Sequence, residues 1–132
     1  RATLEKVATW FPRIDVEALI HRLRPNLVIE GVDAFWEDRL VPSGKIRIGG
    51  TILEGAKPVP RCIVPSRDPW TGEEYEGFRA TFIRKRKETF PDWADRSDFG
   101  GHFSLMTATH APPKSRGDAL HVGDHVEVLS DH

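Results

Sequence analysis

The beginning of the chain alternates apolar and polar residues with the period of a helix. The apolar positions within residues 3–11 fall three or four apart, which places them on one helix face. They are Leu4, Val7, Ala8 and Phe11. Thr3 can cap the first turn, and Pro12 ends the segment because proline cannot continue a helix. We therefore expect a short helix with one buried face.

Two further helices are predicted by the same pattern. Residues 15–23 begin at Asp15, a good N-cap, and end before Pro25. Residues 78–90 place large apolar side chains on one side of a helix. These side chains are Phe78, Phe82 and Ile83.

Four segments are typical of strands separated by turns. They cover residues 27–31, 45–55, 102–111 and 120–129. Residues 45–55 predict a hairpin or bulged strand around Gly49-Gly50, and residues 120–129 predict a hairpin around Gly123-Asp124. Residues 67–77 carry Asp-Pro and Thr-Gly turn signals. Several short strands with two or three peripheral helices predict a mainly β domain of the β-barrel type.

The composition of the 132 residues fits one folded domain. Hydrophobic residues make up 39% and charged residues 30%, which excludes a disordered chain. The 19 basic and 20 acidic residues nearly cancel, so the charge argues against nucleic acid as a partner. No apolar run approaches the roughly 20 residues that span a bilayer, so we expect no membrane segment.

The single cysteine excludes an internal disulfide and favours a reducing compartment, which predicts a cytoplasmic protein. The chain begins with Arg1 rather than methionine, so we expect it to be trimmed or cut from a longer protein. A targeting signal upstream of Arg1 would not be visible in this sequence.

Cys62 lies in the proline-rich run KPVPRCIVPSRDP, residues 57–69. The cations near it in sequence are Lys57, Arg61 and Arg67. Nearby cations favour the thiolate, the form that attacks or binds a soft metal. Pro58, Pro60 and Pro65 stiffen the backbone, as a metal ligand or sulfur carrier requires. The alternative is that Cys62 packs as a small buried hydrophobe, which is common for a free cysteine.

A second candidate group surrounds Pro25. Arg22, Arg24 and Asn26 lie just before the strand predicted at residues 27–31. A guanidinium binds phosphate or carboxylate through a rigid fork, and an asparagine both donates and accepts. The alternative is a set of solvated charges at a helix end.

Other chemical signals are weaker. The run Arg84-Lys85-Arg86-Lys87 fits a solvated helix face better than an anion or RNA patch, because it is short and the chain is net acidic. The six histidines accompany no cysteine pair, which argues against a structural zinc site. Ser66 and Ser104 lack the glycines of a nucleophile elbow, and residues 50–57 lack the Lys-Ser/Thr of a phosphate loop.

Three stretches together resemble one family. LRPNLVIEG (23–31), residues 45–73 and LHVGDHVEVL (120–129) follow the order and approximate spacing of the MOSC family. This is the C-terminal domain of molybdenum cofactor sulfurases, also found in mitochondrial amidoxime-reducing component and its bacterial relatives. The matching motifs are Arg24-Pro25-Asn26, Arg61-Cys62, Asp68-Pro69 with Thr71-Gly72, and Val122-Gly123-Asp124. The resemblance runs over nearly the whole chain.

The resemblance implies a MOSC-type β-barrel over residues 1–132, as the C-terminal portion of a longer domain whose upstream strands are missing. It implies that Cys62 coordinates molybdenum or carries sulfur as a persulfide. The positions that would hold the anionic pterin of the molybdenum cofactor are Arg24, Asn26 and Arg61. Pyridoxal phosphate binding enters by family association only. Residues 78–111 match the family loosely and would contribute to the substrate mouth.

Three functions follow as hypotheses. The first is a molybdenum-dependent oxidoreductase component that reduces N-hydroxylated small molecules with electrons from a partner protein. The second is a sulfur carrier that receives persulfide sulfur at Cys62 from a cysteine desulfurase, for metal–sulfur cluster or cofactor assembly. The third is a β-barrel interaction module without catalysis.

Overall fold

The computed structural model describes residues 1–115 and 117–132. The α-helices are α1 (Ala2–Ala8), α2 (Val16–Leu23), α3 (Phe78–Thr89) and α4 (Arg96–Phe99). The 3-10 turns are η1 (Trp36–Leu40), η2 (Val64–Ser66) and η3 (Pro113–Ser115). The strands are β1 (Lys45–Ile48), β2 (Thr51–Pro60), β3 (Ser104–His110) and β4 (Val126–Ser130). The three helices predicted from periodicity are confirmed, with ends that shift by at most a few residues.

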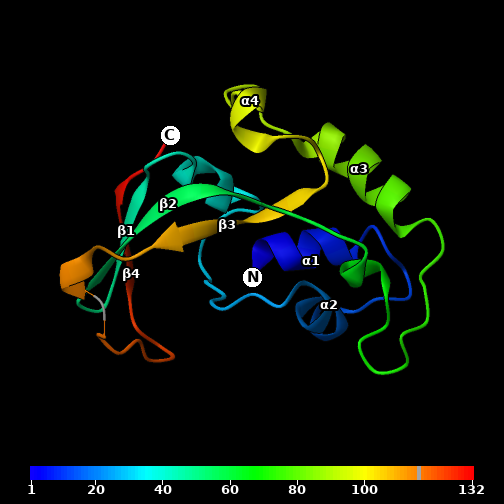
Figure 1. Cartoon of the computed structure of the whole chain (residues 1–132), viewed down its shortest axis with the longest axis horizontal. Coiled ribbons are helices and arrows are strands. Elements are labelled where there is room, and N and C mark those ends of the chain that lie inside the picture. The colour runs from blue at the N-terminus through cyan, green and yellow to red at the C-terminus, as the bar shows by residue number, and fades with distance from the viewer. Residues whose placement is uncertain (116) are drawn as a thin grey trace.

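The four strands form one antiparallel sheet in the order β3-β2-β1-β4. β1 and β2 are joined at Gly49 and Gly50, and Ile46 lies opposite Leu53, so the hairpin predicted at residues 45–55 is confirmed. β3 and β4 are the two edges of the sheet, and the described strands do not close on one another (Figure 1). The mainly β class, with α+β detail, is therefore confirmed, whereas a closed barrel is not.

β2 is the long strand next to the sheet edge, and its last part is irregular. Its register with β3 shifts twice, the second time between Pro58 and Pro60. Proline lacks an amide donor, so a ladder that contains two prolines cannot pair regularly. Just beyond the strand, the Arg61 amide donates to the Phe103 carbonyl at 2.8 Å. This bond anchors the start of the segment that carries Cys62.

The main core lies where α1, α2 and α3 gather at one end of the sheet (Figure 1). Its buried apolar residues are Leu4, Val7, Trp10, Phe11, Ile14, Leu19, Leu23, Phe78, Phe82 and Leu105. Phe11 stacks on Phe78 with ring centroids 4.4 Å apart, which joins the segment after α1 to α3. A smaller cluster on the sheet contains Leu40, Ile46, Ile48 and Leu53. The first three helices, α1, α2 and α3, therefore share one core with β3 beside the Cys62 segment.

The strand predicted at residues 27–31 is wrong. The segment pairs with no described strand, and Leu27 and Val28 are 48% and 43% exposed. The terminal amine of Arg1 donates to the Ile29 carbonyl at 2.5 Å, so the start of α1 lies alongside. A β-rich sequence forms a strand only where it hydrogen-bonds to a neighbouring strand; here a cavity lies between residues 27–29 and the free edge strand β3.

Two local predictions also differ from the structure. Thr3 does not cap α1 but lies inside it, where its hydroxyl donates to Glu37 and accepts from the Phe35 amide, both at 2.8 Å. Residues 120–129 do not form a hairpin with themselves. Their first part is a turn in which the Asp124 carboxylate accepts a backbone amide, and β4 pairs with β1. In both cases a distant partner replaces the local one.

The basic run at residues 84–87 is not wholly solvated, because Arg86 is 1% exposed. This arginine follows Phe82 by four residues and therefore continues the apolar face of α3. Its Nη2 donates to both carboxylate oxygens of Asp38, at 2.8 and 2.6 Å. Its Nε donates to the Ser104 carbonyl at 3.3 Å. The prediction of a solvated face is wrong for this residue.

Candidate functional site

Cys62 lies between the end of β2 and the turn η2, and it is a free, exposed cysteine. Its neighbours Ile63 and Val64 are also open, at 62% and 52% exposed. The alternative in which the thiol packs as a small buried hydrophobe is therefore wrong. A thiol that faces solvent on a short turn is available to a metal, a sulfur donor or a substrate.

Arg61, directly before the cysteine, fixes this turn to two other elements. Its Nε and Nη2 donate to the Leu105 carbonyl of β3 at 3.2 and 2.7 Å. Its Nη1 donates to the Leu23 carbonyl at the end of α2, at 3.0 Å. Burial lowers the pKa of Arg61, and the adjacent Cys62 opposes this change. Because all three bonds go to neutral carbonyls, the positive charge beside the thiol is not cancelled.

Arg24 and Asn26 follow the end of α2 and are both exposed. Arg24 is the C-cap of the helix, in the left-handed conformation with φ 54°, and Pro25 prevents the helix from continuing. The bond from Arg61 to the Leu23 carbonyl joins this helix end to the base of the Cys62 turn. This bond links the two segments that carry the predicted site residues, but among the described residues the side chains of Arg24 and Asn26 make no hydrogen bond to the Cys62 turn.

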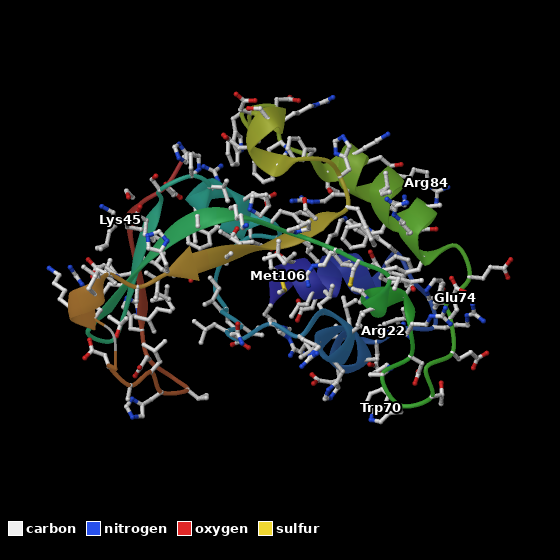
Figure 2. The ribbon with its side chains drawn as sticks, viewed as in Figure 1. Arg22, Lys45, Trp70, Glu74, Arg84 and Met106 are labelled. Atoms are coloured by element: carbon white, nitrogen blue, oxygen red, sulfur yellow. The ribbon has the colours of Figure 1, made fainter. Side chains whose placement is uncertain are left out.

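The loop of residues 67–75 folds back on itself around Asp68. The Asp68 Oδ1 accepts the amides of Thr71 and Trp70 at 2.8 and 2.9 Å, a turn that the Asp-Pro and Thr-Gly signals predict. These hydrogen bonds stabilise the carboxylate and lower the pKa of Asp68. Trp70 stands at the tip of the loop and is 68% exposed (Figure 2). The loop thus gives the region around Cys62 an ordered wall.

Cys62 and Arg61 line a hollow of about 570 Å³. Its walls include the aromatic rings of Tyr75 and Phe103 and the side chain of Arg79, whose guanidinium lies 5.3 Å from the Phe103 ring centroid. A hollow of this size can hold a small organic molecule beside the thiol. Glu74 also lines the hollow, but its carboxylate lies 3.7 Å from Arg67, so Arg61 and Arg79 leave a positive balance beside the aromatic rings that suits a flat, anionic group.

A second cavity of about 330 Å³ lies between the sheet and the segment that follows α2. Asn26 lines this cavity, as does Glu37 from η1. Burial raises the pKa of Glu37, and the hydrogen bond from Thr3 opposes this change. Of the predicted site residues, Asn26 therefore faces this cavity, whereas Cys62 and Arg61 face the larger hollow.

Three contributors to the site were not assigned by the motifs. Local chemistry already placed Arg22 among the candidates, but the family motif begins two residues later. Tyr75 and Arg79 carry no local signal, because their contribution depends on how α3 lies against the Cys62 turn. Only the fold could have revealed Tyr75 and Arg79 as parts of the site.

The fold and the site define a mainly β domain that presents one exposed thiol beside an uncancelled arginine. The sequence profile of the MOSC domain matches residues 2–127 of the 132. The chain therefore belongs to the MOSC domain family. This family is related to the molybdenum cofactor sulfurases and is associated with binding of the molybdenum cofactor. A comparison with curated proteins finds no match. Within the described residues, every helix is too short or too polar to cross a bilayer.

The residues present fit an anionic cofactor that contains a soft metal. Cys62 offers an exposed sulfur, which is a ligand type that soft metals favour. The charge of Arg61 remains uncancelled, and Arg24 is exposed with its side chain open to solvent. The donor types therefore agree with an anionic, metal-containing cofactor in sign of charge, although Arg24 lines neither of the two hollows.

Proposed function

We propose that the chain is the molybdenum-cofactor-binding component of an oxidoreductase that reduces N-hydroxylated small molecules. The observation that carries this proposal is the exposed Cys62 in a hollow beside Arg61, with Arg24 and Asn26 at the adjoining helix end. Membership of the MOSC family supports the choice of cofactor. The single cysteine points to a reducing compartment such as the cytoplasm.

Each residue would have a distinct role in this function. Cys62 would supply the thiolate ligand to the metal. Arg24 and Asn26 would bind the anionic pterin and its phosphate, and Arg61 would hold the turn and add positive charge. The bound cofactor would supply the redox chemistry, while the protein binds and orients it.

The electrons would come from a partner protein. One cysteine cannot hold an iron–sulfur cluster, which takes four cysteine ligands in its usual form. The exposed turn around Cys62 would let a reduced partner approach the site. The reducible substrate would be a small molecule that enters the hollow of about 570 Å³.

The test is the molybdenum content of protein produced in cells that make the cofactor. Cys62→Ser and Arg24→Met should each lose most of the bound molybdenum. Arg84→Met is the matched control, since it removes an exposed arginine on α3 outside the site, and it should keep the metal. Reduction of an N-hydroxyamidine by a chemical reductant should follow the metal content. Equal molybdenum in wild type and Cys62→Ser would contradict the ligand role.

A second candidate function is sulfur transfer, and the same exposed thiol favours it. A desulfurase persulfide would pass its outer sulfur to the Cys62 thiolate, which leaves a desulfurase thiol and a Cys62 persulfide. Mass spectrometry after incubation with a cysteine desulfurase and cysteine should then find about 32 Da, one sulfur atom, added at Cys62. If neither metal nor persulfide is found, an interaction module without catalysis is the remaining function.

A further inference from the structure

Arg22 reaches from the last turn of α2 toward the loop that follows Cys62 (Figure 2). The residue is 7% exposed. Its Nη1 donates to the Pro65 carbonyl at 3.1 Å, and its Nη2 lies 3.8 Å from the Asp68 Oδ2. One buried arginine of α2 therefore contacts both the turn η2 and the loop that continues from it.

The buried position of Arg22 is costly. Burial lowers the pKa of Arg22, and the nearby carboxylate of Asp68 opposes this change. Its Nε has no hydrogen-bond partner among the residues that the structure describes. A leucine or methionine would fill such a position at lower cost if packing were the only requirement. The contacts to Pro65 and Asp68 are therefore what distinguishes the arginine from an apolar residue.

Arg61 makes the same connection in the opposite direction. It starts at the base of the turn and donates to the Leu23 carbonyl, the residue next to Arg22. The two arginines thus tie the turn to the end of α2 on both sides of Cys62, one directly before it and one through Pro65. The thiol itself makes no hydrogen bond with any described residue, so its position depends on the backbone held at these two points.

We propose that Arg22 is a positioning residue for Cys62, which holds the turn η2 and the Asp68 loop against α2. The role rests on the proposed function in so far as the position of the thiol matters to the metal or to sulfur. The contacts of Arg22 with Pro65 and Asp68 are present in the protein without cofactor, so their effect can be measured there.

Arg22→Met tests the proposal in the cofactor-free chain, with Arg84→Met as the matched control. Hydrogen exchange of the amides in residues 63–71 should accelerate about tenfold in Arg22→Met, because a charge-assisted bond to the loop is lost. The rate at which iodoacetamide alkylates Cys62 should change severalfold at fixed pH. Arg84→Met should leave both unchanged.

Two further variants separate positioning from a general loss of structure. Arg22→Lys keeps the charge and a hydrogen-bond donor, so it should restore part of the wild-type exchange protection that Arg22→Met loses. Asp68→Asn keeps the acceptor for the Thr71 and Trp70 amides but removes the charge that faces Arg22. It should show a smaller acceleration in the same residues. If Arg22→Met fails to fold, hydrogen exchange in Asp68→Asn tests the proposal instead.

In protein loaded with molybdenum, Arg22→Met should alter the electron paramagnetic resonance signature of the metal per molybdenum bound. Unchanged exchange and alkylation in both Arg22→Met and Asp68→Asn would overturn the positioning role. Absence of molybdenum from the wild type would instead contradict the proposed function, and the exchange and alkylation results would still decide the role of Arg22.

Discussion

Two regions of this protein hold an arginine away from solvent, one fully buried and one half-buried, and they use its charge in opposite ways. In the interior, Arg86 faces the Asp38 carboxylate and lies 4.7 Å from the Phe35 ring centroid. Beside the thiol, Arg61 donates only to main-chain carbonyls. A carboxylate cancels the charge of its partner, whereas a carbonyl dipole satisfies the donors and leaves the charge. The first arrangement suits a core, and the second suits a site that receives an anion.

The strongest test of this contrast is Arg86→Met. It leaves the Asp38 carboxylate, 1% exposed, without its partner, and a broken buried pair costs about 3–5 kcal/mol of the free energy of unfolding. Chemical denaturation measures this loss. The double variant Arg86→Met with Asp38→Leu should recover much of it, because no unpaired charge remains. A loss below about 1 kcal/mol in the single variant would show that the pair does not hold the core.

The second largest effect is a dependence of the free energy of unfolding on pH. It is expected from His102, which lies near Arg86. Burial lowers the pKa of His102, and the positive charges of Lys87, Arg96 and Arg86 lower it further. The unfolded chain therefore binds a proton here at a higher pH than the folded chain does. Stability should fall as the pH drops below about 6.5, because the partly buried ring must then become charged in a positively charged surrounding.

Denaturation at pH 7.5 and at pH 5.5 measures this dependence. His102→Gln should reduce the loss of stability between the two values. His125→Gln, at an exposed position, is the control and should keep it. An identical loss in wild type and His102→Gln would assign the pH dependence to other groups.

The smallest effect on stability is expected at the site itself. Cys62→Ala removes an exposed side chain and no described hydrogen bond, so the free energy of unfolding should stay within about 0.5 kcal/mol of wild type. The same measurement under the conditions used for Arg86→Met provides the comparison. A loss above about 2 kcal/mol would mean that the thiol supports the fold rather than serving the site.

The parts of the fold that depend on short-range signals could be predicted from the sequence. α2 begins at Asp15, whose side chain accepts the Ala18 amide at 2.7 Å, and it ends beside Pro25. The β1–β2 hairpin follows from alternation around two glycines. Such signals act within a few residues, so one chain is enough to identify them.

The parts that failed depend on partners far along the chain. Residues 27–31 have strand propensity but pair with no described strand, and Thr3 bonds to Glu37 instead of capping its own helix. The charge of Arg86 predicts a surface position, whereas its spacing from Phe82 places it on the buried face of α3. Helical position was the better guide there than charge.

The candidate site shows the same division. Cys62 and its motif neighbours could be named from the sequence, because each motif is a local string. The contact between the two segments could not be predicted, since the bond from Arg61 to the Leu23 carbonyl joins residues 38 positions apart. The contact of Arg22 with Pro65 spans 43 positions and gives no pattern along the chain.

Gly55 shows how one backbone contact can restrict the substitutions that a position tolerates. A Cβ at this position would lie 2.0 Å from the Leu40 carbonyl oxygen at the end of η1. That obstacle is main chain, so no side-chain rotation could relieve it, and any replacement would push η1 away from the sheet. The same turn carries Asp38, the partner of Arg86. A complete substitution scan would therefore record Gly55 as intolerant for a steric reason, although Gly55 does not line the hollow beside Cys62.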